Sequence, residues 1–330
     1  MIALVTGSSG FIGGSLVAEL LRHGDEVRCL VRPTSRISRE APANLMRYTV
    51  DYTRPDLGLA PDVLRGVDIV YHLAGATNAI SVAAFYRANV EPIGNLLHAL
   101  HAAGATPKRL LLVSSQAAGG PALSPAQPVT EQMRGEPFEP YGGSKRAAEL
   151  VLDAAAGDIP FTVVRPAAVY GPGDRAFLTI FKMARRGVVL YPAIRDHWVS
   201  VIAIDDVIEG ILKAASNPGA VGGTYYLAHE QPVQWREIYR VVAATLGRAR
   251  VVEINVPSLL VDTVALAGDA LAAVTGRARL LNRNKVALGT PRFWICSTQQ
   301  AARELDFQAT TGLQDGMRAA YDWYLQQRWL

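Results

Sequence analysis

Apolar segments typical of buried strands alternate with helical segments along the first half of the chain, and this order strongly limits the fold. Strands are expected at 1–7, 25–32, 44–51, 67–75, 109–115 and 161–171. Helices are expected at segments rich in alanine and leucine, which are 14–24, 82–104 and 141–156. Because crossovers between parallel strands are right-handed, this order predicts an α/β fold with a doubly wound parallel sheet, covered by helices on both faces.

Composition narrows the class of protein further. The chain has 330 residues, of which 50% are hydrophobic and 19% are charged, so it can bury a large core. The net charge is only +4, and no stripe of basic and aromatic residues suggests nucleic-acid binding. No apolar run is long enough to span a bilayer, and no signal peptide is recognised before the first strand. The two cysteines, Cys29 and Cys296, offer no disulfide framework, and a cytoplasmic location is expected.

The histidines do not predict a metal site. His98 and His101 lie three residues apart on an expected helix, but no acidic partner is near them in the sequence. We therefore expect no metal, and we expect these two side chains to lie on a packed or solvated helix face.

A glycine-rich turn follows the first expected strand. Gly7, Gly10 and Gly13 are spaced three residues apart in the segment TGSSGFIGG, directly before an expected helix. Such a turn lets the chain pass from strand into helix, and it lets backbone amides at the helix N-terminus approach a pyrophosphate. A glycine motif alone is weak evidence, but its position after the first strand of an alternating chain predicts dinucleotide binding.

A tyrosine and a lysine are spaced four residues apart in the segment YGGSK. Tyr141 and Lys145 fall on one face of the helix that this segment opens. A free tyrosine has a pKa near about 10, too high for a base at neutral pH, and a neighbouring ammonium lowers that pKa by stabilising the phenolate. The spacing fits a general acid/base, although it also arises between ordinary surface residues.

Five motifs occur in the order and at the spacing typical of one enzyme superfamily. They are TGSSGFIG at 6–13, HLAG at 72–75, SSQAAGG at 114–120, YGGSK at 141–145 and RPAAVYGPGD at 165–174. The chain thereby resembles the extended short-chain dehydrogenases/reductases of the NAD-dependent epimerase/dehydratase superfamily. Its motifs are most similar to those of dihydroflavonol reductases and 3β-hydroxysteroid dehydrogenases, and the resemblance extends over nearly the whole chain.

The resemblance implies how the chain is organised. Residues 1–172 would form most of a dinucleotide-binding Rossmann domain, with contributions from about 198–228. Residues 173–330 would form most of a smaller, partly interwoven substrate-binding region. In many relatives, helices that match 82–104 and 141–156 pack against their copies in a second subunit, so a homodimer is expected. The alternative is that both helices are buried within one chain.

The resemblance also implies roles for individual residues. Tyr141 would be the general acid/base, Lys145 would lower its pKa and hold the nicotinamide ribose, and Ser115 would hydrogen-bond the substrate oxygen. Ser115 is chosen over Ser114 because it lies five residues before the last glycine of its motif, as the catalytic residue does in related motifs. For Asn89 the alternative is an ordinary polar residue bonded to backbone. The residues expected at the cofactor are Gly7, Ser9, Gly10, Phe11, Ile12, Gly13, Arg32, Asp51, Tyr52, Leu73, Ala74, Gly75, Asn89, Ser114, Tyr141, Lys145 and Pro166.

The end of the second strand distinguishes the two nicotinamide cofactors. Members that prefer NAD(H) carry an acidic residue there, which binds the ribose hydroxyls. Here that position is Val31, and Arg32 follows it, as a similar arginine does in dihydroflavonol reductases. An arginine can bind the 2′-phosphate that a carboxylate would repel, and Arg36 is close enough in sequence to assist. NADP(H) is therefore expected, with NAD(H) as the alternative, and Asp51 and Tyr52 are expected to flank the adenine.

Two classes of substrate remain open. Nucleotide-sugar enzymes commonly carry an asparagine where this chain has Ala168 and an arginine where it has Val199. A buried diphosphate would need such groups, so their absence favours the interconversion of a carbonyl and an alcohol on a small, apolar substrate. Arg195 could replace the missing arginine, which keeps a nucleotide-sugar epimerase or dehydratase as the alternative.

A long apolar stretch at 256–276 carries only Asp262 and Asp269 as charged residues. The two lie seven residues apart, on nearly the same face of a helix, so an amphipathic helix is expected. It could pack on the core, cover an apolar substrate pocket, or bind loosely to a membrane surface together with the basic stretch 277–285.

Overall fold

Seven parallel strands form the main sheet of the computed structural model, in the order β11-β6-β5-β4-β1-β2-β3. The structure describes residues 1–35, 42–192, 197–248, 251–275, 286 and 289–330. Every residue of β4 and β5 is buried, because helices cover both faces of the sheet. The strands are β1 (Ile2–Thr6), β2 (Glu26–Val31), β3 (Leu45–Thr49), β4 (Ile69–His72), β5 (Arg109–Val113), β6 (Phe161–Pro166) and β11 (Thr224–Leu227).

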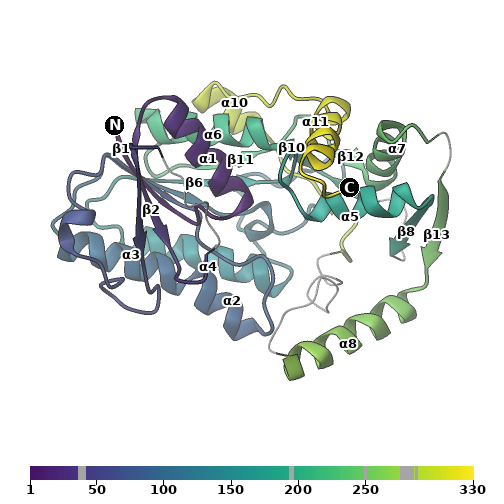
Figure 1. Ribbon diagram of the computed structural model, residues 1–330, viewed down its shortest axis with the longest axis horizontal. Helices are drawn as coiled ribbons and strands as arrows, with labels where there is room; N and C mark the ends of the chain where they lie inside the picture. The colour runs from purple at the N-terminus through teal and green to yellow at the C-terminus, as the bar shows by residue number, and fades with distance from the viewer. Residues whose placement is uncertain (36–41, 193–196, 249–250, 276–285, 287–288) are drawn as a thin grey trace.

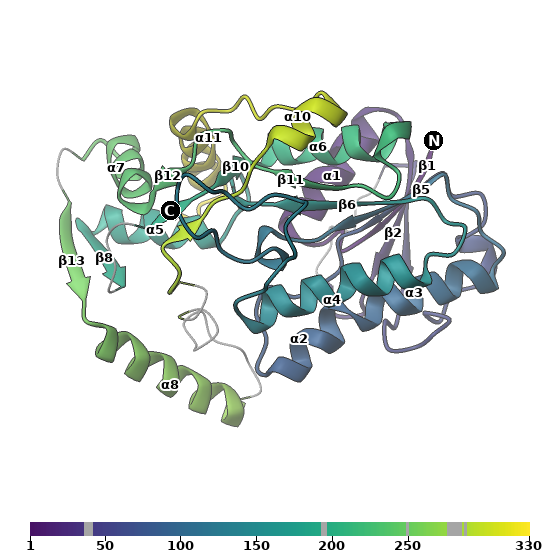
Figure 2. The ribbon, with the colours of Figure 1, turned by 180° about the vertical axis from the view of Figure 1, so that it is seen from behind.

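Helices form a layer on each face of this sheet, and the two layers are visible from the front and from behind (Figures 1 and 2). The arrangement confirms the predicted α/β fold with a doubly wound parallel sheet. One layer contains α1 (Phe11–Arg22), α6 (Ile204–Ser216) and α10 (Gln299–Leu305), and the other contains α2 (Val82–Asn89), α3 (Glu91–Ala102) and α4 (Pro140–Ala155).

The single helix predicted at 82–104 is divided in two, which corrects the sequence analysis. α2 ends at Asn89 and α3 begins at Glu91, with Val90 between them. Pro92 lies in the first turn of α3. A helix that continued through this proline would lose a backbone hydrogen bond, because its nitrogen carries no hydrogen. In the first turn of a new helix that nitrogen needs no partner, so the break costs little.

The order of the sheet gathers the ends of four strands around one crevice. Strand order reverses between β1 and β4, because the chain builds β2 and β3 on one side of β1 and the later strands on the other. In open α/β sheets, ligands bind outside the carboxyl ends of the strands at such a point. Gly7, Leu73 and Ser114 directly follow β1, β4 and β5, and Pro166 ends β6. Four of the five motifs therefore meet at this edge.

Smaller sheets and further helices lie together at the other end of the molecule (Figure 1). Their core is largely aromatic, with Tyr170, Phe181, Tyr191 and Tyr324 fully buried. The pairs and helices are β7 (Ala168–Tyr170) with β10 (Val201–Ala203), β9 (Trp198–Val199) between β12 (Val233–Gln234) and β14 (Phe293–Trp294), β8 (Val188–Pro192) with β13 (Val252–Val256), α5 (Ala176–Arg185), α7 (Trp235–Thr245) and α11 (Leu313–Gln326). Short helical turns occur at η1 (Pro61–Val63), η2 (Gln116–Ala118) and η3 (Pro218–Ala220).

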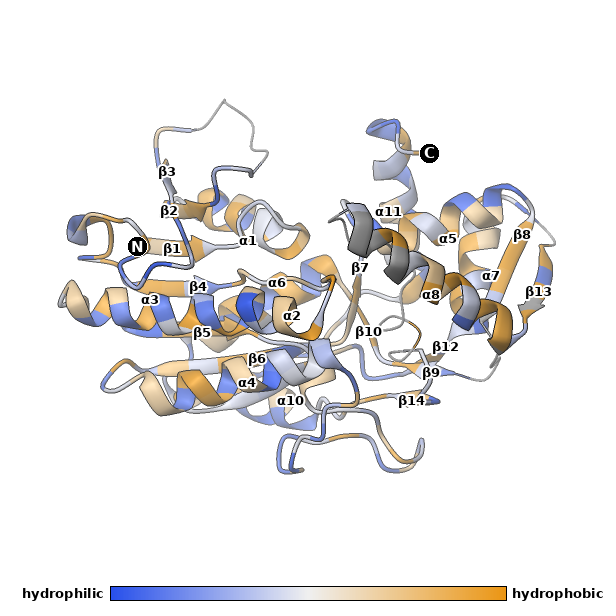
Figure 3. Cartoon of the chain, turned by 90° about the horizontal axis from the view of Figure 1, so that it is seen from below, coloured by the Kyte–Doolittle hydropathy of each residue, from blue (hydrophilic) through white to orange (hydrophobic). Residues whose placement is uncertain are grey.

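Helix α8 (Ser258–Thr275) confirms the helix predicted in the apolar stretch. It follows β13 along the edge of the molecule, with hydrophobic residues along its described part (Figures 1 and 3). Val261 and Ala265 are buried, but Leu259 and Leu266 are 75% and 59% exposed, so only part of the apolar surface of this helix packs on the core. Among the described residues, no helix has both the length and the apolar character needed to cross a membrane. The basic stretch 277–285 lies outside the described residues.

Candidate active site

The turn after β1 has a backbone geometry that glycine adopts most easily. Gly7 has a φ of +70°, and a Cβ at this position would lie 2.6 Å from the carbonyl carbon of Leu73. The N–H of Gly10 donates to the Gly7 carbonyl oxygen at 2.9 Å, and α1 begins at the next residue, Phe11. The first N–H groups of α1 have no acceptor inside the helix, so this end of the crevice suits an anion.

A cavity of about 290 Å³ lies beside this turn, and we call it the cofactor cavity. Arg32, one residue after β2, is exposed at its wall, and no acidic side chain pairs with this arginine in the part of the chain that the structure describes. Arg36, its predicted assistant, lies outside the described residues. The predicted cofactor residues that line the cavity are Gly7, Ser9, Gly10, Arg32, Tyr52, Leu73, Ala74 and Gly75.

Other residues predicted at the cofactor take different places. Asp51 is not part of the cavity lining: its carboxylate accepts hydrogen bonds from N and Oγ1 of Thr53, at 3.0 and 2.7 Å. Its place beside the adenine stays a prediction. Aspartate side chains often accept a hydrogen bond from the backbone two residues further on, so the partner of this carboxylate is a neighbour in the sequence. Ser114 is not at the cavity wall either, because its hydroxyl donates to Glu149 at 2.5 Å. The first turn of α1 contains Phe11, Ile12 and Gly13.

Two buried side chains hold the loop that follows β4, which forms one wall of the cofactor cavity. Asn89 Oδ1 accepts a hydrogen bond from Ala76 N at 2.7 Å, and its Nδ2 donates to Ser144 Oγ at 2.8 Å. Thr6 Oγ1 accepts a hydrogen bond from Ala74 N at 3.0 Å. Asn89 therefore joins this wall to α4. Its contact with Ala76 N agrees with the alternative given for this residue, a polar side chain bonded to backbone.

Helix α4 begins directly before Tyr141 and is capped by a buried carboxylate. Glu139 is 5% exposed and accepts hydrogen bonds from the N–H groups of Tyr141, at 2.6 Å, and Gly142, at 2.7 Å. Pro140 follows it in the first turn, where a missing N–H costs nothing. Because the cap satisfies two free N–H groups of the helix, it determines where α4 starts and how Tyr141 is placed.

The phenol of Tyr141 lies beside Ser115, just past the end of β5. Burial raises the pKa of Tyr141, and the charge of Glu139 raises it further. A hydrogen bond with Ser115 opposes this rise. The Ser115 hydroxyl also accepts a hydrogen bond from Ala117 N at 3.2 Å. The ring of Tyr141 packs against Phe85 of α2, with 6.1 Å between the ring centroids. The structure therefore brings together the tyrosine and serine that the motifs pair.

Lys145 is buried one helical turn after Tyr141. Its Nζ donates a hydrogen bond to the carbonyl oxygen of Val113 at 2.7 Å. A Cβ placed on Gly75 would lie 3.8 Å from this Nζ, so the ammonium lies close to Gly75, a residue of the cofactor cavity wall. Burial lowers the pKa of Lys145 to about 8, and the charge of Glu149 opposes that shift. The net pKa of Tyr141 is raised because burial outweighs the opposing hydrogen bond from Ser115. The expectation that Lys145 lowers this pKa stays a prediction.

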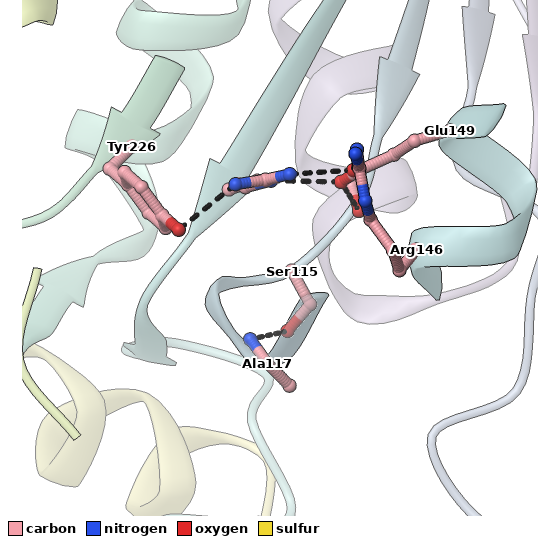
Figure 4. A network of polar contacts seen from close by, with 7 residues as sticks. Ser115, Ala117, Arg146, Glu149 and Tyr226 are labelled. Carbon is pink, nitrogen blue, oxygen red and sulfur yellow. Dashed lines mark hydrogen bonds and ion pairs between the residues drawn. The ribbon is translucent and has the colours of Figure 1, made fainter. Parts of the chain in front are cut away.

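A buried polar network joins α4 to β6 and β11 (Figure 4). Glu149 accepts hydrogen bonds from two nitrogens of Arg165, at 2.9 and 2.7 Å, and both side chains are 4% exposed. A third nitrogen of Arg165 donates to the hydroxyl of Tyr226 at 3.0 Å. Because Ser114 also donates to Glu149, the network fixes the end of β5 and, with it, the position of Ser115.

A second cavity of about 300 Å³ opens at Ser115 and Tyr141, and we call it the substrate cavity. Ala168 and Val199, the two positions that bear on the substrate class, both stand in its wall. None of its described lining comes from α8, so a role of this helix in covering the pocket stays a prediction. The lining consists of Ser115, Gln116, Ala117, Tyr141, Pro166, Ala167, Ala168, His197, Val199, Trp235, Gly289 and Trp294.

The sequence analysis missed four polar residues of this site: Glu139, Glu149, Arg165 and Gln116. Two of them carried a recognisable signal. An acidic residue before a proline, as at Glu139, is a common helix start, and Glu149 lies four residues after Lys145 on the same helix face. No sequence signal distinguishes the buried side chains of Arg165 and Gln116, since their burial and partners come from distant segments.

The chain matches the family model of the NAD-dependent epimerase/dehydratase family over residues 3–228, which is more than half of its length. The chain belongs to this family. It is an NAD(P)-dependent oxidoreductase of the extended short-chain dehydrogenase/reductase type, so the resemblance seen in the five motifs is confirmed.

Full-length relatives of this epimerase/dehydratase-family enzyme include reductases. A ceramide reductase of Caulobacter vibrioides is 30% identical over 337 residues, covering 100% of this chain and 96% of that protein. A 4-hydroxy-2-methyl-3-oxo-4-farnesyl-3,4-dihydroquinoline-1-oxide ketoreductase of Stigmatella aurantiaca is 30% identical, covering 97% of this chain and 95% of that one. Among solved structures, MoeE5 in complex with UDP-glucuronic acid and NAD is 25% identical with a TM-score of 0.77, and all of both chains is covered.

Proposed function

We propose that this enzyme reduces the carbonyl group of an apolar substrate, or oxidises the corresponding alcohol, and that it prefers NADP(H). The observation that carries the proposal is the wall of the substrate cavity. Ala168 and Val199 stand there beside Ser115 and Tyr141, where nucleotide-sugar enzymes commonly carry asparagine and arginine. The described lining contains no lysine or arginine. A largely apolar cavity with a few convergent polar groups fits an apolar ketone better than a diphosphate.

The residues around the cofactor cavity fit a nicotinamide dinucleotide. The tight turn at Gly7 and the N-terminus of α1 suit a pyrophosphate. Lys145 lies close to Gly75 of the same cavity and would donate hydrogen bonds to ribose hydroxyls. When bound, the cofactor supplies or accepts a hydride at the carbonyl carbon of the substrate.

Ser115 and Tyr141 can handle the proton of this reaction. In reduction, Ser115 hydrogen-bonds the substrate oxygen, and Tyr141 donates its phenolic proton to that oxygen as the hydride reaches the carbon. Because burial raises the pKa of Tyr141, its phenol is protonated and ready to donate at neutral pH. The Lys145 ammonium then lies one helical turn from the phenolate that forms. In alcohol oxidation the same proton returns to Tyr141.

The names of two relatives agree with an apolar substrate: one is a ceramide reductase, and the other is a ketoreductase of a farnesyl-substituted compound. A nucleotide-sugar epimerase or dehydratase is the alternative, since MoeE5 holds UDP-glucuronic acid in its structure. Arg195, which could pair with a diphosphate in this chain, lies outside the described residues.

The preference for NADP(H) is supported by the end of β2. The strand ends at Val31, which cannot accept a hydrogen bond from ribose hydroxyls through its side chain, and Arg32 follows at the wall of the cofactor cavity. A guanidinium there attracts the 2′-phosphate of NADP(H), whereas NAD(H) gains nothing comparable from it. NAD(H) is the alternative cofactor.

A homodimer is supported by apolar side chains on the helices that carry the site. Val82 and Tyr86 of α2 are 53% and 41% exposed, and Leu150 of α4 is 52% exposed. Neighbouring helices with exposed apolar residues fit an interface better than they fit solvent. The cytoplasmic location stays a prediction, and so does loose contact of α8 with a membrane surface.

The test of the proposed function is a comparison of substrate classes. The enzyme is incubated with NADPH or NADH and with apolar ketones, and cofactor oxidation is followed by absorbance; UDP-sugars are offered in parallel, and their products are analysed by chromatography. We expect turnover of ketones and none of UDP-sugars. Epimerisation or dehydration of a UDP-sugar without ketone reduction would establish the alternative.

A further inference from the structure

Gln116 is a polar residue of the substrate cavity that the proposed reaction does not use. It follows Ser115, opens η2 and lines the cavity. It is 5% exposed, and its amide nitrogen has no hydrogen-bond partner within the described protein. Buried amide donors are nearly always paired, so an unpaired one in a cavity wall indicates a group that a ligand satisfies.

The backbone beneath Gln116 is held firmly. Ser115 Oγ accepts a hydrogen bond from Ala117 N at 3.2 Å, and Gly119 N donates to the Gln116 carbonyl oxygen at 3.0 Å. On the other side, α4 approaches so closely that a Cβ on Gly142 would lie 2.3 Å from the carbonyl oxygen of Ala117. The amide can therefore change its orientation only through its own side-chain torsions, which keep it near the reacting group.

Few other residues of the substrate cavity carry side chains that could hydrogen-bond a polar group of the substrate. Apart from Ser115, Gln116 and Tyr141, most of the described lining is apolar or aromatic, and His197 already has an interaction of its own. A polar substituent that enters with the reacting carbonyl therefore has a donor within reach at Gln116.

We propose that Gln116 binds a second oxygen of the substrate, close to the carbonyl that Ser115 and Tyr141 hold. Gln116 directly follows Ser115, and both line the same cavity of about 300 Å³, so a group bound at Gln116 is only a few bonds from the carbonyl held by Ser115. The substrate class is then a β-oxo ester, amide or acid with an apolar chain, whose ester, amide or acid oxygen accepts a hydrogen bond from the Gln116 amide. This inference rests on the proposed reduction and narrows its substrate.

The test compares two compounds that differ in the ester group, which supplies the second carbonyl oxygen. Methyl 3-oxodecanoate carries it, and dodecan-5-one has the same chain length without it. We would measure kcat/KM for both with wild type, Gln116→Met, which removes the amide at similar size, and Gln116→Glu, which keeps the size but removes the donor. The ratio of the two kcat/KM values cancels changes that affect both compounds alike. Cofactor binding, measured by fluorescence, shows that each variant is folded.

We expect the ratio of ester to ketone to fall about tenfold or more in both variants, because a site that hydrogen-bonds a substrate group discriminates strongly against its loss. An unchanged ratio, including an equal loss for both compounds, would overturn the role of Gln116 while leaving the reductase function standing. If the wild type reduced neither compound with either cofactor, the proposed function would fall, and this subsite with it.

Discussion

The carboxylate of Glu149 and the guanidinium of Arg165 form a paired contact, with hydrogen bonds of 2.9 and 2.7 Å, although the residues lie on different elements. Glu149 is one helical turn after Lys145 on α4, and Arg165 directly precedes Pro166 at the end of β6. The pair therefore connects the helix that carries Tyr141 to the sheet edge at which both cavities open.

Removing Glu149 should be costly, because it leaves the buried charge of Arg165 without its partner. We expect Glu149→Leu to lower the free energy of unfolding by about 3–5 kcal/mol, measured by urea denaturation. Glu19→Ala, which breaks an exposed pair with Arg22, should cost at most about 1 kcal/mol. The double variant Glu149→Leu/Arg165→Met should be more stable than Glu149→Leu alone. Equal effects of Glu149→Leu and Glu19→Ala would contradict this role.

The same pair should make stability sensitive to acid. Burial alone would raise the pKa of Glu149, but hydrogen bonds and charge from Arg165, with hydrogen bonds from Ser114 and Arg146, hold it below its usual 4.5. Because the folded pKa lies below the unfolded one, the contribution of this group is complete above pH 4.5 and is lost as the pH falls through the folded pKa. Unfolding free energy measured down this range should fall less steeply in the double variant.

Tyr141→Phe should lower kcat at least about a hundredfold, because the phenolic proton has no substitute on the ring. Cofactor affinity should barely change, since the ring and its contact with Phe85 remain. Tyr48→Phe is a matched control: its hydroxyl lies on edge strand β3 near Met46, away from both cavities. Steady-state kinetics with the preferred ketone would decide, and wild-type turnover in Tyr141→Phe would remove this residue from the mechanism.

Cofactor affinity should weaken as the pH rises from 7 to 9. Burial lowers the pKa of Lys145 to about 8, so its ammonium, and the charge-assisted hydrogen bonds it offers to ribose hydroxyls, are present below that pH and lost above it. We expect a several-fold increase in the Kd of NADPH across this range, measured by fluorescence titration. Lys145→Met should bind weakly at every pH. A flat profile in the wild type would show that Lys145 does not hold the cofactor through its charge.

Arg32→Ala should weaken NADPH binding about ten- to a hundredfold and leave NADH nearly unchanged, because only NADPH offers a 2′-phosphate to the guanidinium. Arg22→Ala, a charge removed from the exposed end of α1, should change neither affinity. Titration of both cofactors would check the pair of variants. Tighter binding of NADH than of NADPH by the wild type would reverse the proposed preference.

Light scattering at micromolar concentration should give the mass of two chains. Leu150→Glu, on the outer face of α4, should shift the mass toward one chain, because it places a charge in an apolar interface. Leu123→Glu changes a loop leucine that is 87% exposed, and it should leave the mass unchanged. A wild-type monomer at this concentration would rule out the dimer.

Much of the fold follows from local patterns along the chain. The doubly wound parallel sheet was expected because apolar strands alternate with helices. The glycines of the first turn predicted dinucleotide binding beside β1, where the cofactor cavity lies. The spacing of Tyr141 and Lys145 placed both residues on one face of α4, where the structure has them. The break between α2 and α3 at Val90 also has a local cause, because Pro92 favours the start of a new helix at this point of the sequence.

The partners and the electrostatics of the site were decided by tertiary structure. Arg165 meets Glu149 only because β6 lies beneath α4. The pKa of Tyr141 was expected to fall from one neighbouring charge, yet it rises. Spacing along a helix determines which side chains are neighbours, whereas desolvation depends on everything that packs around them, and only the folded chain brings those atoms together.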